Sequence, residues 1–80
     1  MDQKEFNELH SSCVSAFKNY AAQADITASM LANCTAEPMP LRDRLKIAVQ
    51  ESMENAAHRL YLSAKGLLHE AVRLGYAFAD

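Results

Sequence analysis

Three ionisable side chains, His58, Lys65 and His69, stand together in the last third of the chain and raise the question of phosphoryl chemistry. Histidine phosphotransfer domains carry His-x-x-Lys-Gly, in which a lysine one helical turn after the histidine steadies the phosphoryl oxygens. Here Lys65 and Gly66 follow His58 only after the segment "RLYLSA". On a helix this spacing places the lysine roughly 10 Å further along the axis. We therefore expect no phosphotransfer here, and interpret His58 and Lys65 as the solvated polar flank of a packed helix.

A second group with ligand-type side chains consists of Glu51, Glu54 and His58. Di-iron helical bundles use a Glu-x-x-His motif that projects inward, with further glutamates from other helices. This chain has Glu54-x-x-x-His58, so its spacing departs from that motif. We predict no metal site and no cofactor.

Cys13 lies one helical turn after His10, which is a spacing at which histidine can activate a thiol. A pair of rigid helices offers no oxyanion donors, however, because amides inside a helix are already hydrogen bonded. We expect no catalytic residue and no enzymatic activity. Cys13 and Cys34 would be roughly 30 Å apart on one helix, which is beyond the reach of a disulfide.

Positive charge concentrates only in "RDRLK", which contains Arg42, Arg44 and Lys46. These three residues are the candidates for contact with an anionic partner. The net charge of −2 argues against a broad electrostatic surface for nucleic acid. We therefore expect no nucleic-acid binding at physiological salt.

The N-terminal segment "MDQKEFNELH" is acidic and lacks the apolar stretch of a secretory signal. Elsewhere, no apolar run approaches the roughly 20 residues that span a bilayer. These features predict a cytoplasmic protein with no membrane partner.

Two long helices must position all of these residues. Asp2 and Glu5 have the spacing of a helix-capping box, and we predict a helix over about 2–34. Pro38 and Pro40 push the residues before them out of the α region, which predicts a stiff loop over 35–40. A second helix is expected over about 41–79. The chain is thus predicted to be a single all-α domain, residues 1–80, folded as a two-helix antiparallel hairpin with long arms.

The second helix carries a seven-residue repeat of small and large side chains. The small position holds Ala57, Ala64 and Ala71 and continues to Phe78, and the large one holds Met53, Leu60, Leu67 and Leu74. Such layers interdigitate, with a left-handed supercoil. We predict that Leu60, Leu67 and Ala64 face the core, and that facing residues of the two helices have numbers adding to about 75.

The first helix repeats the pattern in Val14, Phe17, Ala21, Ala24, Ala28 and Leu31, beside a line of Cys13, Tyr20, Thr27 and Cys34. One hairpin partner cannot cover this much apolar surface. We therefore predict self-association into a four-helix bundle, as a homodimer or higher symmetric oligomer. The expected oligomer interface consists of Phe17, Tyr20, Leu31, Leu60, Leu67, Leu68, Val72, Leu74 and Phe78.

This architecture resembles the small dimeric hairpin bundles that regulate plasmid RNA pairing, which also stack small and large residues in layers. The function predicted first is a small non-catalytic protein–protein interaction or scaffold module, which binds itself and possibly another protein. The alternatives are a Rop-like nucleic-acid regulator acting through Arg42, Arg44 and Lys46, and a bundle that binds a metal or small ligand.

Overall fold

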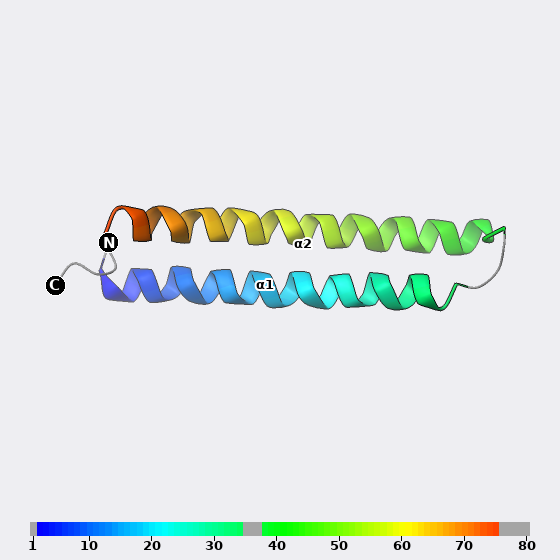
Figure 1. Cartoon of the computed structure of the whole chain (residues 1–80), viewed down its shortest axis with the longest axis horizontal. Helices are drawn as coiled ribbons and strands as arrows, with labels where there is room; N and C mark the ends of the chain where they lie inside the picture. Colours follow the sequence, from blue (N-terminus) through cyan, green and yellow to red (C-terminus); the bar gives the residue numbers. More distant parts are fainter. Residues whose placement is uncertain (1, 35–37, 76–80) are drawn as a thin grey trace.

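The computed structural model describes residues 2–34 and 38–75, which form two helices packed side by side in opposite directions (Figure 1). Helix α1 spans Gln3–Ala32 and helix α2 spans Leu41–Arg73. The molecule measures 60 × 14 × 14 Å, so it is a rod two helices wide. The predicted all-α antiparallel hairpin is confirmed.

Helix α1 begins where its sequence supplies a cap. The Asp2 side chain accepts a hydrogen bond of 2.8 Å from the backbone N–H of Glu5, which confirms the predicted N-cap. The helix ends at Ala32, and the backbone N–H of Asn33 still donates to the carbonyl oxygen of Ser29.

Proline and glycine set the two ends of α2. Pro40, with φ of −57°, immediately precedes the helix, and its carbonyl oxygen accepts from the backbone N–H of Arg44 at 3.0 Å. At the other end, Gly75 adopts a φ of +77°, a left-handed conformation that suits glycine and stops the helix. The sequence predicts that the second helix ends near 79, but α2 ends at Arg73. Residues 76–79 lie outside the described residues.

The two helices meet along an inner seam that alternates spacings of three and four residues. Every member is buried or half-buried, and the spacing is that of a heptad coiled coil. On α1 and just beyond it the seam comprises Phe6, Leu9, Cys13, Ala16, Tyr20, Gln23, Thr27, Met30 and Cys34. On α2 it comprises Asp43, Ile47, Gln50, Glu54, Ala57, Tyr61, Ala64, Leu68 and Ala71.

The register of the hairpin follows from contacts between the helices. The rings of Phe17 and Tyr61 and those of Tyr20 and His58 are in contact, and in both pairs the residue numbers add to 78. Met30 and Ile47, whose numbers add to 77, line one depression between the helices. The hydrogen bond between Gln23 and Gln50 joins residues whose numbers add to 73, and the rings of Tyr20 and Tyr61 give 81. The sequence-based sum of about 75 lies within this range.

The rotation of α2 about its axis also differs from the sequence prediction. The predicted small line is part of the seam, since Ala57 and Ala71 are buried and Ala64 is half-buried. Leu60 and Leu67, predicted to face the core, are instead 65% and 62% exposed. The seam contains Glu54, Tyr61 and Leu68, which stand three positions before the alanines and are half-buried. It does not contain Leu60, Leu67 and Leu74, which stand three positions after them.

The hairpin has a thin apolar core. Among the described residues the buried apolar side chains are Cys13, Ile47, Ala57 and Ala71, and no large side chain is fully buried. Small folded domains depend on burying apolar surface and are marginal when they bury little. The isolated hairpin therefore leaves most of its apolar side chains in contact with water.

Candidate interaction surface

A polar cluster interrupts the middle of the seam. The side-chain amide of Gln50 donates to the Oε1 of Gln23 at 2.9 Å and to the backbone oxygen of Gln23 at 3.2 Å. The Thr27 hydroxyl donates to the same backbone oxygen at 3.1 Å. Thr27 and Gln50 are both buried, so this cluster ties α1 to α2 at one register. Sequence reasoning missed Gln23 and Gln50, although both fit the spacing of three and four once polar residues are counted.

Aromatic side chains form a second contact region next to the polar cluster. The ring centroids of Tyr20 and His58 are 4.7 Å apart, those of Phe17 and Tyr61 are 5.2 Å apart, and the Lys65 ammonium lies 5.9 Å from the Tyr61 ring. His58 is half-buried rather than solvated as predicted. It packs against a tyrosine ring, so its position is explained by packing.

The residues considered for metal binding do not converge, whereas His10 and Cys13, considered for catalysis, both line a depression of about 350 Å³. Within residues 2–34 and 38–75, no three His, Cys, Asp or Glu side chains are placed to hold a metal ion. Glu51 is exposed, and Glu54 lies in the inner seam. His10 stacks on Phe6 at 6.4 Å. Cys13 and Cys34 are free thiols, and Cys13 is buried.

The basic residues near the start of α2 do not share one face. Arg42, Arg44 and Lys46 are all exposed. Successive members are two residues apart, which is about 200° of rotation on a helix. Arg42 and Lys46 therefore lie on one side of α2, while Arg44 lies on another. This divergence leaves the predicted anionic contact without a single basic patch.

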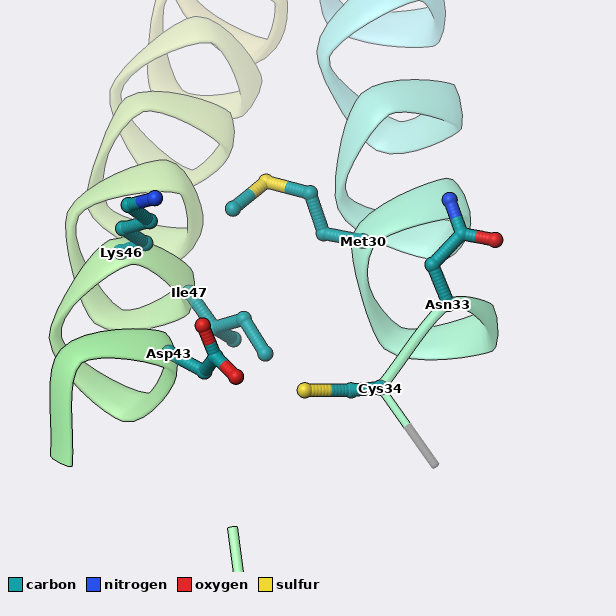
Figure 2. Close-up of a pocket in the computed structure, with 6 residues that line it drawn as sticks. All are labelled: Met30, Asn33, Cys34, Asp43, Lys46 and Ile47. Atoms are coloured by element: carbon teal, nitrogen blue, oxygen red, sulfur yellow. The ribbon is translucent and has the colours of Figure 1, made fainter. Parts of the chain in front are cut away.

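Lys46 also borders a depression of about 230 Å³ at the loop end of the hairpin, lined by Met30, Asn33, Cys34, Asp43, Lys46 and Ile47. Figure 2 shows the Cys34 sulfur and the Asp43 carboxylate directed into the space between the helices, and Met30 reaching across toward α2. The mixture of thioether, thiol, carboxylate and amide groups matches no metal set or catalytic pair.

The α1 stripe is one exposed apolar surface on the hairpin. It consists of Val14, Phe17, Ala21, Ala24, Ala28 and Leu31. Phe17 and Leu31 are each 49% exposed, while Ala21 and Ala24 are half-buried. At 100° per residue, this stripe lies about a quarter turn around α1 from the inner seam.

The α2 stripe is another exposed apolar surface. It consists of Val49, Met53, Ala56, Leu60, Leu67 and Leu74, all of them exposed. It too lies about a quarter turn from the seam, but in the opposite rotational sense. Because the helices run antiparallel, the two stripes occupy opposite broad faces of the hairpin.

The residues predicted for the oligomer interface divide between the seam and the two stripes, except that Val72 is exposed outside both. Tyr20 and Leu68 are half-buried seam residues. The exposed ones are Phe17, Leu31, Leu60, Leu67, Val72 and Leu74. Phe78 lies outside the described residues.

No family model matches the chain, and neither a curated protein nor a solved structure matches it. Neither α1 nor α2 is long and apolar enough to cross a membrane.

The exposed Glu70–Arg73 ion pair raises the pKa of the Arg73 guanidinium, since the neighbouring carboxylate accepts its hydrogen bonds. The two apolar stripes are therefore the surfaces on which a functional hypothesis can rest.

Proposed function

We propose that this chain is a small protein–protein interaction or scaffold module that associates with further copies of itself through the α1 and α2 stripes. The supporting observation is the imbalance between a thin core and extensive exposed apolar surface. Thirteen large apolar residues are exposed, whereas Ile47 is the one large apolar residue classed as buried among those described.

The energy available from covering these stripes is substantial. Complete burial of a Val, Leu, Ile, Phe or Met side chain contributes about 1.5–3 kcal/mol. Leu60 and Leu67 are more than half exposed, and Met53 is 50% exposed, so half or more of that contribution is unrealised in a single hairpin. Association of hairpins would bury this surface and would supply the core that one hairpin lacks.

The smallest closed assembly that covers apolar surface on such a hairpin is a dimer with four helices. The proposal assigns the module no catalytic role. It keeps the cytoplasmic location that the sequence predicts.

Thermal unfolding at several protein concentrations tests the proposal. If folding is coupled to association, the midpoint rises with concentration by mass action. We expect a clear upward shift of the circular dichroism midpoint between about 1 and 100 µM protein. A midpoint that stays constant over this range would contradict self-association.

A further inference from the structure

The α1 stripe has the geometry of a second heptad seam. Its members, Val14, Phe17, Ala21, Ala24, Ala28 and Leu31, are spaced alternately by three and four residues, as the inner seam is. The large side chains stand toward the two ends and the alanines near the middle. Small central residues allow two helix axes to approach closely.

This stripe is complementary to a reversed copy of itself. When two α1 helices run antiparallel with facing residue numbers that add to 45, Val14 faces Leu31 of the other copy and Phe17 faces Ala28. Ala21 then faces Ala24, close to the two-fold axis that relates the two copies. Large residues meet small ones or fill the ends, which is the arrangement that interdigitating layers require.

The charges on α1 match the same pairing. Between His10 and Ala32 the acidic and basic residues are Lys18 and Asp25, seven residues apart on one flank of the stripe. Both are exposed, and neither belongs to an ion pair within the described hairpin. In the reversed pairing, Lys18 of one copy lies about two residues, or roughly 3 Å, along the axis from Asp25 of the other. The two-fold symmetry creates this contact twice.

We propose that α1 binds α1 of a second copy of this chain in antiparallel orientation, through the α1 stripe, with reciprocal Lys18–Asp25 pairs fixing the register. This inference rests on the self-association proposed above and names the surface and orientation that it uses. In a parallel two-fold pairing, the flanks that carry Lys18 and Asp25 in the two copies would lie on opposite sides of the interface, so these charges could not pair across it. The α2 stripe, on the opposite face, remains open to further copies.

Charge reversal of each partner tests the orientation. In Lys18→Asp both contacts become Asp–Asp, and in Asp25→Lys both become Lys–Lys. We expect each variant to dimerise roughly 3- to 30-fold more weakly than wild type at low salt, since two exposed pairs change sign together. Sedimentation velocity over a dilution series measures the dissociation constant, and circular dichroism checks that both variants remain helical.

Two complementary mixtures sharpen the test. The double variant with Lys18→Asp and Asp25→Lys restores both opposite-charge contacts, as does an equimolar mixture of the two single variants. Both should recover dimerisation close to that of wild type. Lys4→Asp is the matched control, because its facing position would be residue 41, beyond the end of the partner α1. It should change affinity less than twofold, as an exposed site outside the contact.

The outcomes separate this inference from the proposal on which it rests. A wild-type chain that is monomeric at every concentration would remove both. Wild-type oligomers whose affinity is unchanged by Lys18→Asp and Asp25→Lys would leave self-association standing and would exclude the α1–α1 pairing. Weakening in both single variants without recovery in the double variant would also overturn the proposed register.

Discussion

At the residue scale, Gln50 is the side chain that most directly links the two helices. It is buried at the centre of the seam, and its amide bonds both the side chain and the backbone of Gln23. A buried amide costs free energy unless its hydrogen bonds are made. A slipped register would separate Gln50 from Gln23, so the cluster favours one alignment of α1 and α2.

Gln50→Ala should lower the free energy of unfolding by about 1–3 kcal/mol, because it removes the donor that Gln23 uses and leaves a small cavity. Urea denaturation at a fixed protein concentration measures the change. Gln3→Ala is the control, since Gln3 is exposed and bonds only locally to Asn7; its effect should stay under about 0.5 kcal/mol. An equal, negligible effect of both substitutions would mean that the cluster does not stabilise the hairpin.

His58 illustrates how a chemically suggestive residue can have a packing role. Its ring lies 4.7 Å from that of Tyr20, at the edge of a group that includes Tyr61 and Phe17. Aromatic pairs of this kind add about 0.5–1.5 kcal/mol beyond their burial. Replacing His58 should therefore weaken the packing of α1 against α2. The effect should be larger than for a residue on a solvated flank, where the sequence analysis places His58.

At the element scale, the alanines of α2 determine how closely the helices pack. Ala64 is half-buried in the inner seam, and the register places it opposite Cys13. Leucine there would force the helices apart. Ala64→Leu should destabilise the fold by about 1–3 kcal/mol through overpacking.

Ala48→Leu introduces the same larger side chain at an exposed position of the same helix and should change stability by less than about 0.5 kcal/mol. Thermal melts of the two variants at equal concentration compare them. A larger loss in Ala48→Leu than in Ala64→Leu would show that α2 is rotated differently from the structure.

Gly66 lies inside α2 and Gly75 lies just beyond its C-terminal end. Replacing each of them by alanine should have opposite effects on stability. Neither glycine has an atom within 4 Å of the position that an added Cβ would take, so backbone conformation decides both outcomes. Gly66→Ala, inside the helix, should stabilise by up to about 1 kcal/mol. Gly75→Ala, at a φ of +77°, should destabilise by about 1 kcal/mol because side chains disfavour that conformation. Chemical denaturation of both variants would test the helix end, and a stabilising Gly75→Ala would contradict it.

The sequence predicts the elements better than their rotation. Asp2 and the two prolines mark helix ends because capping and fixed φ are local properties. The small line through Ala57 and Ala64 is also visible as a heptad. The large residues that accompany these alanines in the core are ambiguous from the sequence. Tyr61 and Leu68 stand three positions before an alanine, and Leu60 and Leu67 stand three positions after one. The seam contains Gln50 and Glu54, so counting apolar residues alone favours the wrong side.

At the scale of the whole molecule, shape and composition point the same way. A rod of 60 × 14 × 14 Å has few interior positions, and the chain contains 50% hydrophobic residues. Such a shape cannot cover that much apolar surface by itself. The stripes on opposite faces would therefore be the surfaces on which a stable assembly is built.

The molar mass of the purified chain shows whether hairpins associate in solution. Sedimentation equilibrium, at concentrations from about 1 to 100 µM, measures mass independently of shape, which matters for so elongated a molecule. We expect a mass at least twice the 8.9 kDa of one chain at the upper concentrations, with dissociation on dilution. A folded helical protein that remains at 8.9 kDa throughout would contradict it.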